Sequence, residues 1–103
     1  MTAHIAIPQE QIREFCQHWQ ITELALFGSV LRDDFRPDSD VDVLVRFEKE
    51  SRHTLSDLSR MEAELKAIFG REVDLVSRRA IETSRNYLRR KAILESAEVV
   101  YGA

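Results

Sequence analysis

The sequence predicts an α/β (α+β) domain, in which helices pack against a small mixed β-sheet. Three observations support this fold class. The 103 residues have the size of one small domain, which we expect to span residues 1–103. The composition, 44% hydrophobic and 32% charged, is typical of a globular chain. Helical and strand-like apolar patterns also alternate along the chain.

The first two elements are predicted to be a helix and a strand. Pro8 suits the first turn of a helix over residues 7–19. Residues 23–29 read as a strand that ends at Gly28. The helix has one apolar face, made of Ile12, Phe15, Cys16 and Trp19.

The next segment combines a short helix, a turn and a second strand. Ser29 is a natural N-cap for a short helix over residues 30–33, and RPDSD at 36–40 has turn chemistry. Residues 41–47 alternate with the period of a strand. Val41, Val43, Val45 and Phe47 are expected on one face, and Asp40, Asp42, Leu44 and Arg46 on the other.

The C-terminal half predicts a long helix, a strand, a last helix and an edge strand. The long helix covers residues 54–69 and ends at Gly70. The last three elements are expected at 71–77, 84–97 and 98–102. The apolar face of the long helix comprises Leu55, Leu58, Met61, Leu65 and Ile68.

Asp40 and Asp42 are the candidate metal-binding pair. On one strand face they lie about 6–7 Å apart. Two anions that close repel each other unless a cation lies between them, and Mg²⁺ readily takes carboxylate oxygens. Asp74 is a lone acid in the third strand, and it can join the pair if that strand is the neighbour. Three such carboxylates could hold two metal ions. The alternatives are a solvated turn at the pair and a solvent-facing edge at Asp74.

Gly28 and Ser29 are the candidate phosphate-binding residues. Glycine permits close approach of the backbone, and free N–H groups at a helix start bind phosphate oxygens. A phosphate-binding backbone and a metal-binding acid pair would lie at the ends of neighbouring elements. Together they would let a hydroxyl group attack a nucleoside triphosphate.

These residues match a known family. Gly28-Ser29, ten intervening residues and Asp40-x-Asp42 form the signature of polymerase-β-like nucleotidyltransferases. The stretch GSVLRDDFRPDSDVDVLV and the later VDLV resemble the minimal nucleotidyltransferases (MNT) of HEPN/MNT toxin–antitoxin systems. The resemblance covers nearly the whole chain and implies the nucleotidyltransferase palm-like fold.

The resemblance also implies roles for the site residues. Asp40 and Asp42 would bind two Mg²⁺ ions. Asp74 would complete the metal site or accept the proton of the attacking hydroxyl. Gly28 and Ser29 would hold the β- and γ-phosphates of the substrate ATP.

The implied reaction transfers AMP from ATP to a tyrosine of a cognate HEPN-domain ribonuclease toxin and releases pyrophosphate. The chain would then be the antitoxin and would form a hetero-oligomer with the toxin. Two other functions stay open: an antitoxin that blocks its toxin sterically, and a nucleotidyltransferase that acts on a small molecule or RNA.

Two basic features have open interpretations. Arg32 could contact the nucleotide or pair with a nearby aspartate. The C-terminal part of the chain carries six basic residues within fourteen positions, which form either a solvated helix face or a patch for phosphate or an acidic partner. These residues are Arg78, Arg79, Arg85, Arg89, Arg90 and Lys91, and Tyr87 and Leu88 lie among them.

The remaining composition restricts the partners. A net charge of −3 argues against direct binding of nucleic acid or an anionic membrane. Cys16, the single cysteine, fits a reducing cytoplasm, and we expect it in the core. The three histidines, including His53, lack metal-ligand spacing and are expected at the surface.

Overall fold

The computed structural model describes residues 7–28 and 40–102. Within these residues four strands form one sheet with the order β3-β2-β1-β4. The central β1 is antiparallel to β2 and to β4, whereas β2 and β3 are parallel. The predicted mixed sheet is therefore confirmed. The strands are β1 (Ile21–Phe27), β2 (Val41–Phe47), β3 (Val73–Ser77) and β4 (Glu98–Gly102).

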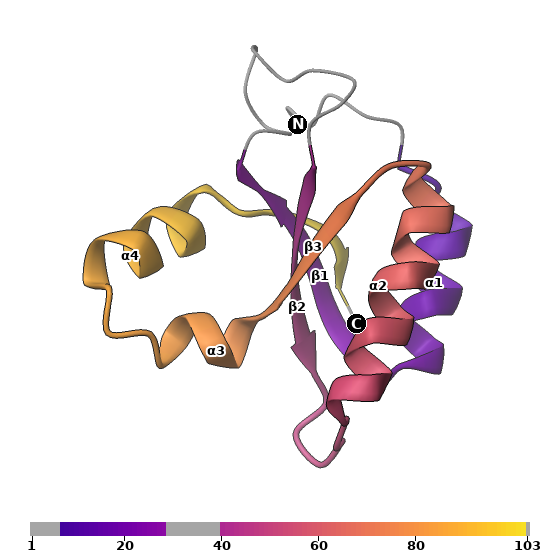
Figure 1. Ribbon diagram of the computed structural model, residues 1–103, viewed down its shortest axis with the longest axis horizontal. Helices are drawn as coiled ribbons and strands as arrows, with labels where there is room; N and C mark the ends of the chain where they lie inside the picture. The colour runs from indigo at the N-terminus through magenta and orange to yellow at the C-terminus, as the bar shows by residue number, and fades with distance from the viewer. Residues whose placement is uncertain (1–6, 29–39, 103) are drawn as a thin grey trace.

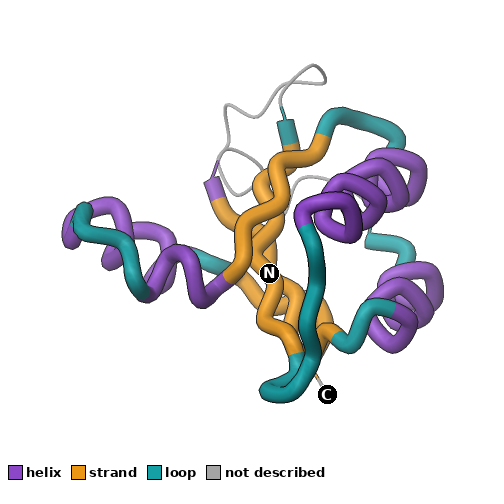
Figure 2. Tube along the Cα trace, turned by 60° about the horizontal axis from the view of Figure 1, so that its bottom comes forward, coloured by secondary structure: helices purple, strands orange, loops and turns teal. Residues whose placement is uncertain are grey.

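Helices lie on both sides of this sheet (Figure 1). α1 (Gln9–His18) and α2 (Leu55–Phe69) pack side by side on one face. α3 (Arg78–Glu82) and α4 (Tyr87–Ser96) project from the other side, and the view in Figure 2 shows the same separation. The order helix, strand, strand, helix, strand, helix, helix, strand follows from the described ranges.

The main core lies between the sheet and the two long helices. Val41, Val43 and Val45 are at most 1% exposed and face this core, as the alternation of β2 predicts. The helices contribute most of the apolar faces that their spacing predicts, including Ile12, Phe15, Cys16, Met61 and Leu65. Leu55 was expected on the same face but is 82% exposed, because it lies in the first turn of α2, at the end of the helix.

A second, smaller core lies on the opposite face of the sheet. Leu44 points the same way as Asp42, as predicted, but it is only 3% exposed. It is buried because α3 and α4 bring Ile81 and Ile93 over this face. Ala25 and Phe27 of β1 complete this cluster.

Local capping determines where the helices begin and end. Thr54 is the N-cap of α2, and its hydroxyl and the Asp57 carboxylate exchange hydrogen bonds with each other's backbone N–H. Gly70 ends α2 in the left-handed conformation, with φ 71°, as predicted. Ser77 caps α3 by accepting a hydrogen bond from the Ala80 N–H.

The structure corrects several predicted bounds. β1 begins at Ile21, two residues earlier than expected, and α3 was not expected at all. α4 begins only at Tyr87 because the Asn86 side chain accepts the Arg89 N–H as an N-cap. The short helix predicted over 30–33 lies outside the described residues.

His53 contradicts the expectation of a surface histidine. Its side chain is 10% exposed, and its ring centroid lies 4.6 Å from that of Phe47 and 6.0 Å from that of Trp19. Its Nδ1 is 3.9 Å from the Asp57 carboxylate. His53 therefore belongs to the packing between β2 and the start of α2.

Within the described residues, no helix combines the length and the apolar character that crossing a bilayer requires.

Candidate functional site

The two-residue period of β2 directs Asp42 away from the main core. Its neighbours Val41 and Val43 are both fully buried against α1 and α2, so Asp42 must leave the opposite face of the sheet. Asp42 is half-buried there, and Asp40 is exposed immediately before the strand begins. The two aspartates are therefore held at the start of β2.

The neighbouring strand adds Asp74 to this end of the sheet. β3 is parallel to β2, and Asp42 and Asp74 are register partners. Adjacent strands lie about 4.8 Å apart, and register partners in parallel strands share a face. The Val41 N–H donates to the Glu72 carbonyl oxygen at 2.9 Å, which fixes this register at the start of β2. Asp74 can join the acid pair only if β2 and β3 are neighbours, and they are neighbours.

Gly28 packs directly against the Asp42 carboxylate. It follows Phe27, the register partner of Asp42 in β1, and has a φ of +77°. A Cβ at Gly28 would collide with Asp42 Oδ2 and would lie 3.2 Å from its Cγ. The position thus needs glycine twice, for its backbone conformation and for the space that the carboxylate occupies.

Ser29 and Arg32 lie outside the described residues. The described part of the chain ends at Gly28, against Asp42, and resumes at Asp40.

The three aspartates share one end of the sheet without forming a closed set of ligands. Within residues 7–28 and 40–102, no three aspartate, glutamate, histidine or cysteine side chains are gathered closely enough to hold a metal ion. Asp74 is exposed, and Asp42 is half-buried. The chemistry of the donors fits Mg²⁺, a hard cation that prefers a few carboxylates together with water and substrate phosphates.

The sheet face that carries Asp42 also carries buried apolar residues. Phe27 is 7% exposed and Leu44 is 3% exposed, and both belong to the second core under α3 and α4. Phe27 is the β1 register partner of Asp42, and Leu44 follows Asp42 two residues along β2. Asp42 therefore lies at the edge of this buried cluster, whereas Asp74 on the neighbouring strand is exposed.

Sequence reasoning missed how this face is covered. α3 is anchored by Arg78, whose guanidinium lies 2.8 Å from a Glu23 carboxylate oxygen and 3.4 Å from Glu82. Glu23 and Arg78 are 55 positions apart, so no local pattern could have paired them. The only local signal for α3 is Ser77 in an N-cap position.

Cys16 is not a candidate nucleophile. It is fully buried in the main core, as predicted, and burial raises the pKa of its thiol to about 12. A thiol with such a pKa stays protonated at neutral pH, and the thiolate is the reactive form.

The arrangement of these residues suits phosphoryl chemistry. Carboxylates that project from the same end of the sheet can bind a divalent ion. Such an ion stabilises the charge that develops on phosphate oxygens. A glycine in contact with one carboxylate lets the backbone approach a ligand bound there.

Comparison with known proteins is in agreement with this chemistry. The family model described as nucleotidyltransferase domain matches residues 9–100. The chain is 34% identical over 83 residues to the protein adenylyltransferase MntA of Thermococcus cleftensis, and this alignment covers 81% of the chain and 75% of the relative.

Solved structures show the same fold. A structure described as a minimal nucleotidyltransferase is 34% identical to the chain, with a TM-score of 0.66 and coverage of 86% of the chain and 85% of that structure. A structure of a toxin–antitoxin with AMP-PNP has a TM-score of 0.70 at 16% identity, with coverage of 94% of the chain and 75% of the other. At that identity, the second likeness concerns the fold alone.

Proposed function

The chain belongs to the nucleotidyltransferase domain family, and we propose that it is the antitoxin of a HEPN/MNT toxin–antitoxin pair. In this proposal the chain is a protein adenylyltransferase that depends on Mg²⁺. It transfers AMP from ATP to a tyrosine of its cognate HEPN ribonuclease toxin in the cytoplasm. A single nucleotidyltransferase domain over residues 1–103 carries this activity.

The observation that carries the proposal is the shared register of Asp42 and Asp74, with Gly28 against Asp42. It supports the carboxylate and phosphate roles that the Gly28-Ser29 and Asp40-x-Asp42 spacing implies. The names of similar proteins support the rest. The relative from Thermococcus cleftensis is named a protein adenylyltransferase, and similar folds occur in toxin–antitoxin structures.

The proposed roles are those that the family resemblance implies. Asp40 and Asp42 hold Mg²⁺, and Asp74 completes this set or accepts the proton of the attacking hydroxyl. Gly28 and Ser29 hold the β- and γ-phosphates, and Arg32 contacts the nucleotide. When bound, the divalent ions neutralise phosphate charge and acidify the attacking hydroxyl.

The reaction forms one phosphorus–oxygen bond and breaks another. The tyrosine oxygen attacks the α-phosphorus of ATP, and the bond from this phosphorus to the bridging oxygen of the β-phosphate breaks. Pyrophosphate leaves with that oxygen. The tyrosine proton passes to a carboxylate or to water, and the product is a tyrosine that carries AMP through a phosphodiester.

The test is the intact mass of a purified HEPN-domain protein encoded beside this chain, after incubation with the chain, ATP and Mg²⁺. We expect an increase by one or more AMP units with the unchanged chain. The Asp40→Ala, Asp42→Ala double variant should give no increase. A matched control is Glu48→Ala, Glu50→Ala, which also removes two acids one residue apart but at the far end of β2.

Three outcomes would separate the alternatives. Binding and inhibition of the toxin without a mass increase, in both the unchanged chain and the double variant, would favour the steric antitoxin. Transfer of AMP to RNA or a small molecule without toxin would favour the third function. Equal transfer by the double variant would refute the role of the aspartates.

A further inference from the structure

The α3–α4 region forms an arm that the proposed chemistry leaves unexplained. This arm, residues 78–96, projects from the sheet on the side away from α1 and α2 (Figures 1 and 2). In its two helices only Ile81 and Ile93 are buried. An isolated ten-residue helix is only marginally stable in water. α4 has a single buried side chain, so packing against its own domain adds little to its stability.

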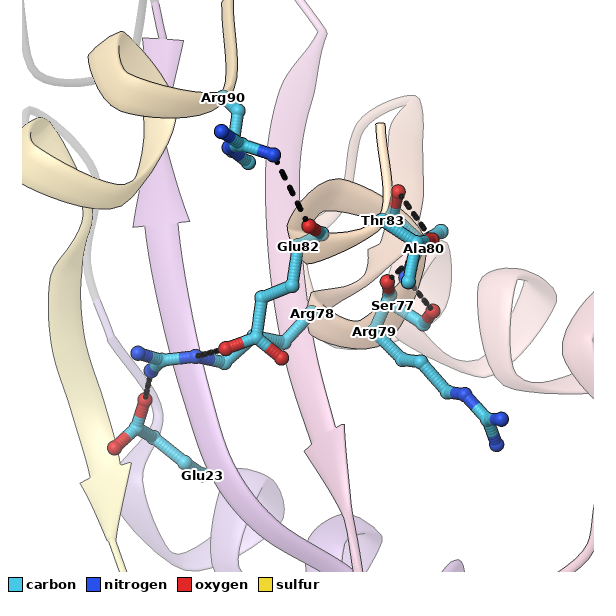
Figure 3. Close-up of polar contacts among 8 residues, drawn as sticks. All are labelled: Glu23, Ser77, Arg78, Arg79, Ala80, Glu82, Thr83 and Arg90. Carbon is cyan, nitrogen blue, oxygen red and sulfur yellow. Dashed lines mark hydrogen bonds and ion pairs between the residues drawn. The ribbon is translucent and has the colours of Figure 1, made fainter. Parts of the chain in front are cut away.

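The base of the arm is nevertheless firmly attached to the sheet. Figure 3 shows Arg78 between the carboxylates of Glu23 and Glu82, at 2.8 Å and 3.4 Å. Arg90 Nη1 donates to the carbonyl oxygens of Glu82 and Ser84, at 3.4 Å and 3.3 Å. These contacts hold α4 against α3. They therefore orient the tip of the arm, residues 85–89, which comprises the end of the turn after α3 and the start of α4.

The tip of the arm exposes large apolar side chains. Tyr87 is 57% exposed and Leu88 is 77% exposed, and both lie in the first turn of α4. Arg90 lies over the Tyr87 ring, with its Cζ 5.3 Å from the ring centroid. Tyrosine and arginine are enriched in binding hot spots, and Leu88 adds exposed apolar surface beside them.

The arm is also the basic part of an acidic protein. Residues 78–91 contain six basic residues and one acidic residue, Glu82, whereas the rest of the chain contains nine basic and seventeen acidic residues. Four of these cations are exposed and have no ion pair within the described residues. They are Arg79, Arg85, Arg89 and Lys91.

We infer that the tip of this arm is the docking surface for the protein that receives the nucleotide. The tip would seat Leu88 and Tyr87 in an apolar depression surrounded by acidic side chains on that protein. This inference rests on the proposed function, because it assigns a place to the protein acceptor. Charge selects the partner: a surface of unpaired cations attracts an acidic surface and is repelled by a basic one.

The position of the arm suits delivery of an acceptor side chain. Ile81 and Ile93 pack on Phe27 and Leu44, which are on the same face of the sheet as Asp42. A protein bound to the arm is therefore on the carboxylate side of the sheet. α1 and α2 cover the other side.

A second copy of the chain fits the tip less well than a different protein. A two-fold symmetric dimer through this surface would bring two basic tips together, which costs electrostatic energy. Docking of the tip onto the acidic remainder of another copy would be head-to-tail and would leave each chain with an open surface.

The test measures binding to the purified HEPN-domain protein encoded beside this chain. Leu88→Ser should weaken the affinity about tenfold or more, because it removes a central apolar contact. Arg85→Glu with Arg89→Glu should weaken it by a similar factor and reduce its dependence on salt. Both changes lie at exposed positions, and circular dichroism with thermal unfolding checks that the variants fold.

Matched controls lie outside the arm. Leu55→Ser removes a leucine that is 82% exposed at the start of α2, and Lys49→Glu with Arg52→Glu reverses two exposed charges after β2. These variants should bind as the unchanged chain does. Equal affinity of the arm variants and the controls would overturn the inference. A dimer of the unchanged chain that Leu88→Ser dissociates, measured by sedimentation, would also overturn it in favour of self-association.

Failure of the inference and failure of the proposed function are distinguishable. If the unchanged chain neither binds nor modifies the HEPN-domain protein, the proposed function fails. If it does both and the arm variants match it, only the docking surface is wrong. If docking occurs at the arm, the arm variants should keep their stabilisation by ATP with Mg²⁺, and their transfer should recover at high acceptor concentration.

Discussion

Asp42 of β2 and Asp74 of β3 are register partners in neighbouring parallel strands, so two carboxylates leave one face of the sheet side by side. The relationship depends on strand order, because the two residues are more than thirty positions apart in the chain. It brings a lone acid in VDLV to the acid pair of DVDV. Gly28 then places the backbone of the preceding strand against Asp42.

Asp74→Asn should reduce the rate of AMP transfer about a hundredfold or more, the typical contribution of a proton-accepting side chain. The fold should remain, because Asp74 is exposed and its removal creates no cavity. The measurement is transfer under single-turnover conditions, with Glu62→Gln as a control on α2. The stabilisation by ATP with Mg²⁺ identifies the role: it persists if Asp74 accepts the proton and falls if Asp74 binds metal. Transfer within a few-fold of the unchanged chain would remove Asp74 from the site.

Gly28→Ala should both destabilise the protein and abolish transfer. The new Cβ needs a left-handed backbone and the space of the Asp42 carboxylate, so we expect a loss of about 2 kcal/mol or more in the free energy of unfolding. Urea unfolding and the transfer assay measure the two effects.

Two other glycines are controls for that substitution. Gly70 has φ +71° and open space around its missing Cβ, so Gly70→Ala should cost only the conformational part, about 1 kcal/mol. Gly102 has neither constraint, and Gly102→Ala should be nearly neutral. If Gly28→Ala cost no more than Gly70→Ala and retained transfer, the contact with Asp42 would have no functional role.

Much of the fold could be predicted because its signals are local. The alternation of residues 41–47 correctly predicts which face carries the valines and which carries Asp42 and Leu44. The cap at Gly70 and the helix after Thr54 also follow from short patterns. The family motif predicts that Gly28 and the aspartates share one site, and Gly28 does lie against Asp42.

What could not be predicted depends on contacts between distant segments. α3 has five residues and one buried side chain, too short for a helical period to be recognised. The burial of Leu44 depends on Ile81 and Ile93, and the burial of His53 depends on Phe47 and Trp19. No pattern within one element reveals that another element covers it.

The free energy of unfolding should fall as the pH rises above about 9 because of Cys16. Burial raises the pKa of its thiol from 9.0 to about 12. Between these values the unfolded chain loses the proton while the folded chain keeps it, so ionisation favours unfolding. The stabilising contribution is complete below pH 9 and is lost at higher pH. Between pH 8 and pH 10 we expect a loss of about 1 kcal/mol.

Urea unfolding of the unchanged chain and of Cys16→Ala tests this pH dependence. The variant is expected to be less stable at pH 8, because it loses buried volume. Its stability should nevertheless depend less steeply on pH by about 1 kcal/mol over the same range. Lysines and tyrosines titrate in both proteins, so the difference between the slopes isolates Cys16. Equal slopes would contradict a raised pKa of the thiol.

ATP and Mg²⁺ together should raise the melting temperature, and neither should suffice alone. Asp40 and Asp42 repel each other and the triphosphate, so the nucleotide and the cation need one another to bind. At a ligand concentration about a hundredfold above the dissociation constant, binding stabilises the folded state by about 2.7 kcal/mol, or roughly 10 °C for a domain of this size. Thermal unfolding with ATP, Mg²⁺, both, and both with excess EDTA measures this coupling. The Asp40→Asn, Asp42→Asn variant should show no shift with both ligands. A full shift in EDTA, or in that variant, would mean that the nucleotide binds without the metal and that the aspartates have another role.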